Sequence, residues 1–185
     1  MSARILIAGL GNLPLPLTRH SVGHFVVDSL ATRLGVKLSS KFGGSYGQTN
    51  ILVDGSPLTL SLYKPNALMN ISGPSVAKAM QASSSSPSAL VIIHDSLDHI
   101  PATLSPKFGG SANGHNGVRS VIAAVKTDEF HRLRIGIGRP SSGVADYVLG
   151  RLSSFERQHW SPDGPGLDAV WEKVEDIARK VARSR

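Results

Sequence analysis

Short apolar runs and helix-spaced apolar positions alternate from the start of the chain. Residues 5–8 form a continuous apolar run that ends in Gly9-Leu-Gly-Asn12, which is typical of a buried strand followed by a turn. Residues 25–34 then place apolar side chains at i, i+3, i+4 and i+7, the spacing of one helix face. The pattern predicts a βα unit with polar groups, among them His20, at its turn.

The same alternation continues along the chain and sets the expected fold class. Further strands are predicted at residues 48–53, 58–63, 89–94 and 131–138, and further helices at 73–82, 118–125, 146–149 and 170–181. Asp54-Gly55 predicts a β-hairpin, whereas residues 41–46 and 95–117 are predicted to be loops. Gly35 is predicted to end the first helix in the left-handed conformation, and Ser72 is predicted to be the N-cap of the helix that follows it. Strands that alternate with helices in this way predict an α/β fold.

Polar side chains follow several of the predicted strands at the point where each strand ends. Asn12 and His20 follow the first strand, Asn70 follows the strand at 58–63, and Asp95 follows the strand at 89–94. In open α/β sheets, ligands bind beyond the carboxyl ends of the strands. We therefore expect these side chains to meet at one site.

Composition narrows the class of protein. A chain of 185 residues that is 41% hydrophobic can bury one substantial core, so we expect a single domain over residues 1–185. The absence of cysteine excludes disulfides, a thiolate nucleophile and cysteine-ligated zinc. No apolar run approaches 18 residues, so no membrane span is expected, and a strand that begins near Arg4 leaves no room for a leader peptide. We expect an intracellular protein, in the cytoplasm or the mitochondrial matrix.

Charge points toward a polyanionic partner. The chain has 20 Lys and Arg against 13 Asp and Glu, a formal net charge of +7. Nucleic acid is the first candidate for such a balance, although a basic protein with a solvated surface fits equally well. The last residues, from Arg179 to Arg185, either follow a nucleic-acid backbone or complement the dipole of the last helix.

Motifs spread over most of the chain resemble bacterial-type peptidyl-tRNA hydrolase. They fall in the order of the family, and they are Gly9-Leu-Gly-Asn12 with Thr18-Arg-His20, Lys64-Pro with Met69-Asn70, His94-Asp95, Lys107 with Gly114-His-Asn-Gly117, and Phe130-His-Arg-Leu-Arg-Ile-Gly136. The chain differs from the family in the loop of residues 13–17, which is shorter and lacks the usual Pro-Gly and aromatic residue, at Ser21, where asparagine is common, and at Ser111-Ala-Asn113.

The resemblance implies a fold and a reaction. The fold would be a twisted mixed β-sheet flanked by helices on both faces. The reaction would be hydrolysis of the ester between a peptide and the tRNA 3′-ribose by directly attacking water, without cofactor or metal. The partner would be tRNA carrying a peptide, and the protein would act as a monomer. The alternative is a non-catalytic tRNA- or RNA-binding module of the same fold.

His20 and Asp95 are the candidate catalytic residues. An imidazole with an ordinary pKa near 6.5 can accept a proton from water at neutral pH, so His20 is the expected general base. Asp95 would accept a hydrogen bond from the other ring nitrogen and stabilise the cation. Taken without the resemblance, an isolated histidine is more often structural, and an aspartate before serine is often a turn cap.

Three amides and one thioether are the candidate substrate contacts. Asn12, Asn70 and Asn116 stand in turns beside predicted element ends and offer donors and acceptors for water, ester and oxyanion. The resemblance places all three in the cleft, with Met69 as an apolar neighbour of the reacting bond. Each asparagine alone is equally an ordinary turn residue, and Met69 alone is equally a core residue.

Lys107 and Arg134 resemble the family's pair that binds the tRNA 5′-phosphate. Leu133, Ile135 and Ile137 alternate toward the core, which places Arg134 on the opposite face of its strand. Arginine suits bidentate phosphate binding and lysine acts as a point charge. The alternative for both is solvated surface charge.

Three other classes of site lack support in the residues. A dinucleotide-binding motif would need a third glycine where Pro14 stands, and no Gly-x-Ser-x-Gly elbow occurs. His94, Asp95 and His99 do not have zinc-type spacing, because alternate strand residues point to opposite faces. We therefore expect no metal site in this segment.

Overall fold

Four parallel strands form the centre of the sheet. The computed structural model describes residues 3–184, and within this range the strands form one seven-stranded mixed sheet in the order β2-β3-β4-β1-β5-β7-β6. The parallel strands are β1 (Ala3–Gly9), β4 (Ser56–Pro65), β5 (Leu90–Ser96) and β7 (His131–Gly136). The antiparallel strands are β2 (Ser39–Lys41), β3 (Gly44–Val53) and β6 (Leu104–Phe108).

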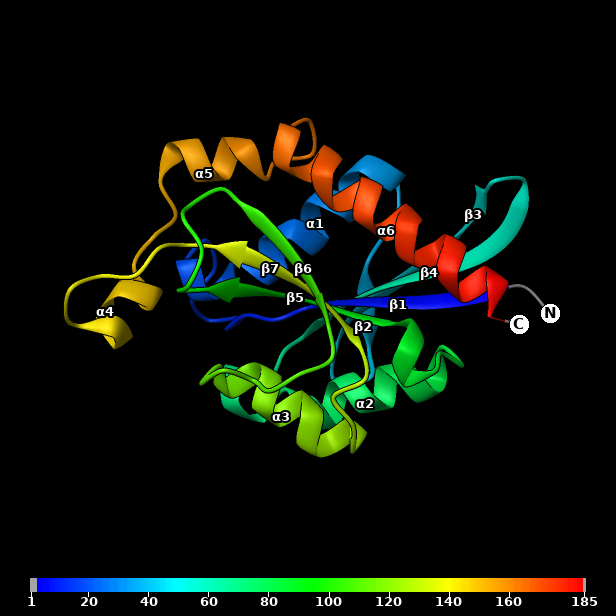
Figure 1. Ribbon diagram of the computed structural model, residues 1–185, viewed down its shortest axis with the longest axis horizontal. Helices are drawn as coiled ribbons and strands as arrows, with labels where there is room; N and C mark the ends of the chain where they lie inside the picture. The colour runs from blue at the N-terminus through cyan, green and yellow to red at the C-terminus, as the bar shows by residue number, and fades with distance from the viewer. Residues whose placement is uncertain (1–2, 185) are drawn as a thin grey trace.

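Helices cover both faces of the sheet, which twists along its length (Figure 1). One face is covered by α1 (Val22–Leu34), α5 (Ser154–His159) and α6 (Pro165–Arg183), and the other by α2 (Gly73–Ala82) and α3 (Asn116–Val125). The short helix α4 (Val144–Leu149) lies beyond the carboxyl ends of β5 and β7. The predicted α/β fold, a twisted mixed sheet flanked on both faces, is confirmed.

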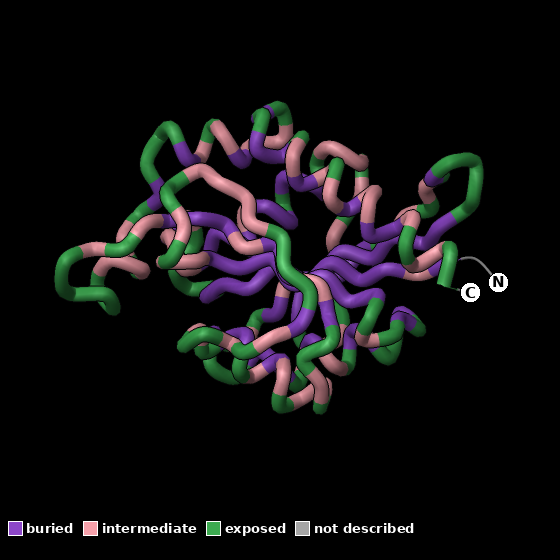
Figure 2. Tube along the Cα trace, viewed as in Figure 1, coloured by how far each residue is buried: buried purple, intermediate pink, exposed green. Residues whose placement is uncertain are grey.

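Alternation along the central strands supplies two cores. In β1, Ile5 and Ile7 pack under α1 and α6, whereas Leu6 and Ala8 pack against α2 and α3. The strands are buried along almost their whole length, as Figure 2 shows. A sheet covered on both faces accounts for the continuous apolar runs in the sequence.

Two predicted loops contain strands, and one short helix was not predicted. Residues 41–46 belong to the hairpin of β2 and β3, in which Ser39 pairs with Tyr46. Residues 95–117 include β6, which pairs with β7 at the edge of the sheet. The prediction that these segments are loops without strands was wrong, because neither has the apolar alternation by which a strand is recognised in the sequence. The helix α5 is only 6 residues long, too short for a periodic signal.

Cap residues give one confirmation and one correction. Gly35 ends α1 with φ +64°, the left-handed conformation that the sequence predicts for this glycine. Ser72 precedes α2, but its hydroxyl donates to the Met69 carbonyl oxygen at 2.9 Å instead of accepting from a helix N–H. The first turn of α2 contains Pro74, which has no N–H to satisfy.

A close approach between β1 and α1 positions the turn that carries His20. A Cβ on Gly23 would lie 2.3 Å from the Ile93 carbonyl oxygen, and a Cβ on Gly9 would lie 2.1 Å from the Gly23 carbonyl oxygen. Glycine at both positions therefore lets the start of α1 rest directly on the sheet. The 3₁₀ turn η1 (Arg19–Ser21) is thereby held at the carboxyl ends of β1 and β5.

Two further 3₁₀ turns, η2 (Met69–Ile71) and η3 (Pro87–Ala89), precede α2 and β5. Within residues 3–184, no helix combines the length and the apolar character that crossing a bilayer requires.

Candidate active site

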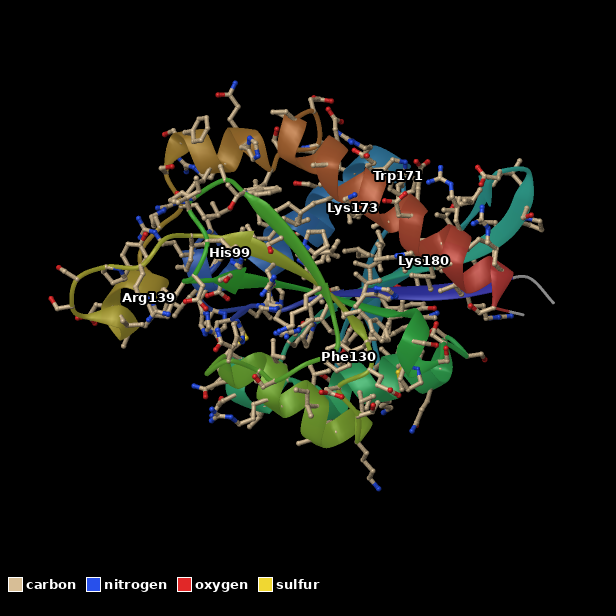
Figure 3. The ribbon with its side chains drawn as sticks, viewed as in Figure 1. His99, Phe130, Arg139, Trp171, Lys173 and Lys180 are labelled. Carbon is tan, nitrogen blue, oxygen red and sulfur yellow. The ribbon has the colours of Figure 1, made fainter. Side chains whose placement is uncertain are left out.

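A cavity of about 660 Å³ opens at the carboxyl ends of β5 and β7. Its walls come from η1, the segment after β5, the loop before α3, and α4. Figure 3 shows Arg139 and His99 at this end of the molecule. The residues that line it include His20, His94, Asp95, Asp98, Asn113, His115, Asn116, Arg132, Arg139, Val148 and Leu149. Of the four side chains that were predicted to meet at one site, His20 and Asp95 line this cavity, whereas Asn12 and Asn70 do not.

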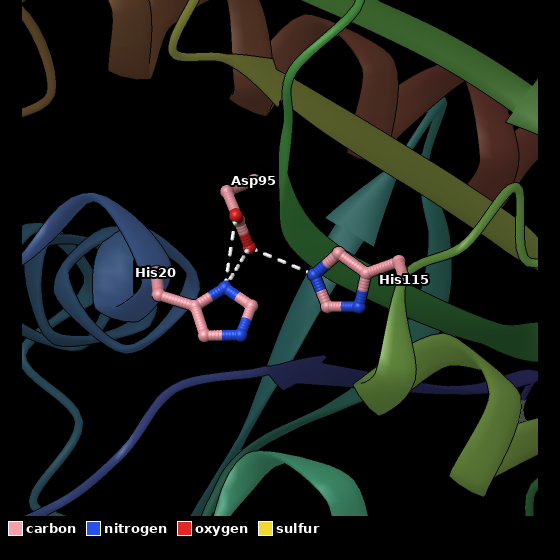
Figure 4. Close-up of side chains that lie close together, drawn as sticks. All are labelled: His20, Asp95 and His115. Carbon is pink, nitrogen blue, oxygen red and sulfur yellow. Dashed lines mark hydrogen bonds and ion pairs between the residues drawn. The ribbon is translucent and has the colours of Figure 1, made fainter. Parts of the chain in front are cut away.

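Asp95 lies between two imidazoles at the base of this cavity (Figure 4). Its carboxylate is 2.9 and 3.0 Å from His20 Nδ1, and Oδ1 is 2.7 Å from His115 Nε2. Asp95 is only 3% exposed, whereas the His20 side chain keeps 18% of its surface accessible. A buried carboxylate thus holds an imidazole that solvent can reach.

Hydrogen bonds assign the tautomers of the two imidazoles. His115 Nδ1 accepts from the N–H groups of Gly117 and Val118 and so caps α3, which leaves its Nε2–H to donate to Asp95. Neutral His20 must donate from Nδ1 to the same carboxylate. The lone pair of His20 Nε2 then has no partner among residues 3–184.

His20, Asp95 and His115 also have the spacing of a metal site, because their ligand atoms lie within 4.8 Å of one another. The hydrogen bonds account for this spacing, since both nitrogen atoms of His115 are engaged. In this conformation the three residues do not present a free set of lone pairs to a metal ion.

Burial and pairing act on the charges in opposite directions. Burial lowers the pKa of His20, but the hydrogen bond and negative charge of Asp95 outweigh it and raise that pKa above 6.5. Burial raises the pKa of Asp95, but His115 and His20 outweigh it and hold that pKa well below its usual range. Asp95 is therefore an anion at neutral pH.

His94 lies beside this group but faces inward. Its Nδ1 donates to the Asp95 backbone oxygen at 2.7 Å, its ring packs edge-on to His115, and its Nε2 is buried without a partner within residues 3–184. Burial holds its pKa well below 6.5, so the ring is neutral.

The predicted amides occupy different depths. Asn12 is buried, and its Oδ1 accepts from the Met69 N–H at 2.8 Å. Its own N–H donates to the Ser21 hydroxyl at 2.9 Å, so Ser21 fixes the turn after β1. Asn116 lines the cavity, and together with Asn70 it also lines a shallow groove between α2 and α3.

Met69 lies beneath the site instead of lining the cavity. It is 4% exposed and belongs to the core under α2 and α3. A Cβ on Gly117 would lie 2.3 Å from its sulfur, so glycine is required for this contact.

The predicted cations lie at the edge of the sheet. Arg134 is held by Ser105, with Nη2 2.7 Å from Ser105 Oγ and Nε 3.1 Å from Ser105 O. Lys107 is exposed, and a Cβ on Gly110 would lie 2.9 Å from its amino nitrogen. Ladder register pairs Lys107 with Arg132 and Ser105 with Arg134, so all four side chains share one face of the sheet.

Sequence reasoning missed the roles of Arg132 and His115. Arg132 is buried and donates from Nη2 to the carbonyl oxygens of Gly109 and Ser111, which braces the Gly-rich loop. The carbonyl oxygens of that Gly-rich loop require hydrogen-bond donors, and this requirement was the only indication in the sequence that Arg132 braces the loop. His115 directly precedes a predicted helix, which was a signal for an N-cap.

Polar and apolar groups form the rim of the cavity. Asp98 accepts from Asn113 Nδ2 at 2.5 Å and from Arg139 Nη2 at 2.7 Å. On the opposite side α4 contributes Val144 and Val148 to the wall. The guanidinium of Arg19, next to His20, lies 4.2 Å from the ring centre of Tyr147 on α4. The apolar wall is thus tied to the turn that carries His20.

The fold and the site together define an α/β protein whose cavity presents an accessible imidazole paired with a buried carboxylate. A family model described as peptidyl-tRNA hydrolase matches residues 6–184. The chain belongs to the peptidyl-tRNA hydrolase family, as its resemblance predicts.

Individual relatives agree with this assignment. A peptidyl-tRNA hydrolase of Geobacillus kaustophilus is 41% identical over 97% of this chain and 93% of its own length. A probable peptidyl-tRNA hydrolase of Mus musculus is 40% identical over 86% of this chain and 79% of its own. The crystal structure of peptidyl-tRNA hydrolase from Acinetobacter baumannii superposes with a TM-score of 0.81 at 36% identity, covering 99% of this chain and 94% of that one.

The tautomers can be measured directly. Long-range ¹H–¹⁵N NMR spectra above neutral pH should show neutral His20 and His94 protonated at Nδ1 and His115 protonated at Nε2, because of the acceptors and donors that face each ring. Spectra of single His→Gln variants would assign the signals. Protonation of His115 at Nδ1 would contradict its role as the cap of α3.

Proposed function

We propose that this chain hydrolyses the ester bond between a peptide and the 3′-ribose of tRNA, with His20 as the general base. Membership of the peptidyl-tRNA hydrolase family supplies the reaction and the substrate. The observation that carries the assignment of the base is the hydrogen bond from His20 Nδ1 to buried Asp95 at an open cavity. Each residue role below is part of this proposal.

His20 Nε2 takes a proton from a water molecule, and the resulting hydroxide oxygen attacks the ester carbonyl. Asp95 stabilises the imidazolium through the Nδ1–H bond and keeps the ring in the required tautomer. When the tetrahedral intermediate collapses, the ribose oxygen leaves and takes the proton from His20. The products are a peptide with a free carboxyl group and tRNA with a free ribose hydroxyl.

The amides would bind the ester and its oxyanion. Asn116 lines both the cavity and the groove that contains Asn70, so these two side chains can reach a substrate that crosses between the two spaces. Asn12 uses its Oδ1 on the Met69 N–H, which leaves its NH₂ group as the donor. One well-placed donor stabilises an oxyanion by about 3–4 kcal/mol. Met69 would support the reacting bond from the core below.

Lys107 and Arg134 would hold the 5′-phosphate of the tRNA. They project from neighbouring strands on one face of the sheet, and Ser105 holds the Arg134 guanidinium in place. A held guanidinium loses less entropy when it binds phosphate. The net charge of +7 favours this partner.

The rival function, an RNA-binding module without turnover, is less well supported. Such a module has no need for an anionic carboxylate that orients an accessible imidazole, yet this chain buries Asp95 for that purpose. Every residue to which this proposal gives a role belongs to one chain, so the mechanism requires no second copy, and we propose a monomer as the working state. We place the protein inside the cell, in the cytoplasm or the mitochondrial matrix.

His20→Ala should lower kcat for N-blocked aminoacyl-tRNA by roughly 10²–10⁴-fold, because the proton acceptor is removed. Binding of deacylated tRNA should stay near normal, since the proposed phosphate contacts lie on β6 and β7. Single-turnover hydrolysis and fluorescence anisotropy would measure the two quantities. The control is His159→Ala on α5, and retention of most activity in His20→Ala would reject His20 as the base.

Asp95→Asn should lower the rate and also move the acidic limb of the pH profile of kcat/KM toward lower pH. The base must be neutral, and the carboxylate raises the pKa of His20 above 6.5, so wild-type activity is lost as pH falls through that raised value. Without the carboxylate, burial alone acts and lowers the pKa. A limb that stays in place would contradict the pairing, and Asp146→Asn on α4 is the control.

Lys107→Ala and Arg134→Ala should each weaken tRNA binding and reduce the slope of log K against log salt by about one unit, because each removes one phosphate contact. Anisotropy titrations at several salt concentrations would give the slopes. Lys78→Ala, an exposed lysine on α2, should change neither. Unchanged slopes in both test variants would show that Lys107 and Arg134 are solvated surface charges that do not contact phosphate.

A further inference from the structure

A second groove lies outside the cavity, between the edge strand β6 and the helix α6. Its volume is about 310 Å³. Residues of β6, β7 and α6 line it, and they are Pro106, Lys107, Phe108, His131, Arg132, Leu133, Lys173, Asp176, Ile177 and Lys180. Lys173 and Lys180 come from the side of α6 that runs along the sheet edge (Figures 1 and 3).

The groove carries uncompensated positive charge. Its lining includes the cations Lys107, Arg132, Lys173 and Lys180 against a single carboxylate, Asp176. Asp176 is already shared, because it accepts from Lys173 at 3.2 Å and from Arg179 at 3.0 Å. Within residues 3–184, no carboxylate lies within 4.0 Å of the Lys107 or Lys180 amino group. The surface of the groove therefore favours an anion.

Two cations elsewhere in the chain show how a local pair removes such charge. Arg33 pairs with Asp168, and Lys64 pairs with Asp28, both at distances below 3 Å between the charged atoms. What distinguishes the groove is that four cations gather around a single carboxylate.

The floor of the groove is apolar and aromatic. Phe108 is 53% exposed, and its ring centre lies 4.8 Å from that of His131, the residue directly opposite in the ladder. Burial and the nearby charge of Lys180 lower the pKa of His131, so its ring is neutral at physiological pH. An uncharged floor between lysines matches the alternation of sugars and phosphates in a nucleic-acid strand.

The groove and the proposed 5′-phosphate contact share the edge strand β6. Lys107 belongs to the lining of the groove and projects on the face of β6 that Arg134 shares. Phe108 and His131 project from the other face of the same two strands, on the side of α6, so a nucleic-acid backbone that passes over the exposed edge of β6 can reach both sets of cations. Pro106 lacks an N–H and lies on this edge, which disfavours addition of a peptide strand there.

We propose that the groove of Phe108, Lys173 and Lys180 binds the sugar–phosphate backbone of the tRNA acceptor stem next to its 5′ end. The lysines contact two backbone phosphates, and Phe108 contacts the sugar between them. This inference rests on the proposed function, since the same tRNA places its ester at His20. The proposed groove adds a contact that a short 3′-terminal oligonucleotide, which lacks the acceptor stem, cannot make.

The test compares Lys173→Ala/Lys180→Ala with the matched control Lys37→Ala/Lys78→Ala, whose two lysines are exposed on other elements. For deacylated tRNA, the salt slope of log K should fall by about 1.5 units in the test variant and remain unchanged in the control. Phe108→Ala should weaken binding several-fold with an unchanged slope, because it removes an uncharged contact.

Kinetics separate this inference from the proposed function. KM for full-length peptidyl-tRNA should rise several-fold in the test variant, whereas kcat and KM for an N-blocked aminoacyl ester of a short 3′-terminal oligonucleotide should stay at wild-type values. An unchanged salt slope in the test variant, or an equal loss of slope in the control, would overturn the groove proposal. An acidic protein would then be the alternative partner for this groove. If the wild type cleaves neither substrate but the slopes differ as expected, the groove stands and the hydrolytic mechanism falls.

Discussion

A buried carboxylate that must remain charged is the constraint on which the rest of the site depends. An isolated carboxylate is strongly disfavoured in a protein interior, so Asp95 requires donors on its oxygens. His20 and His115 supply them from positions 75 and 20 residues away in the chain. One interaction thus joins the turn after β1, the end of β5 and the start of α3. Loss of either imidazole would leave the charge partly uncompensated.

The sheet makes this meeting possible through its register and its close contacts. β5 lies between β1 and β7, so the end of β5 is central to the carboxyl edge. Gly9 and Gly23 let α1 approach β1 without side chains between them, which carries η1 to that edge. On the other side, α3 begins at His115, whose ring both caps the helix and donates to Asp95. Helix capping and charge pairing are therefore the same contact, and a change in one alters the other.

The sequence predicted what periodicity encodes and missed what depends on partners. Buried central strands and the amphipathic α6 produce strong local patterns, so their positions follow from the sequence alone. The edge strand β6 contains Pro106 and Lys107 and is held in the sheet by its pairing with β7, a contact that leaves no local pattern, so its sequence resembles a loop. The alternation of β7 correctly predicts that Arg132 lies on the polar face of the strand. A Gly-rich loop nevertheless covers this side chain, and no local sequence pattern predicts such a contact. The resemblance pointed to His20 and Asp95 as a pair, and the folded chain shows that they are hydrogen-bonded and that His115 donates to the same carboxylate.

The ester and the 5′ end of the proposed substrate would bind to two regions of the protein that differ in their electrostatics. Around Asp95, one buried anion accepts hydrogen bonds from two neutral imidazoles, and the rim cation Arg139 is paired with Asp98. A proton gained by His20 therefore forms a cation next to an anion that is already in place. At the sheet edge, Lys107 and Lys180 have no carboxylate partner within residues 3–184, and attraction there would act on phosphates whatever the base sequence. Under the proposed function, separation of the two regions would let the protein bind the common part of every tRNA through charge, while the chemistry would depend on one short hydrogen-bonded group.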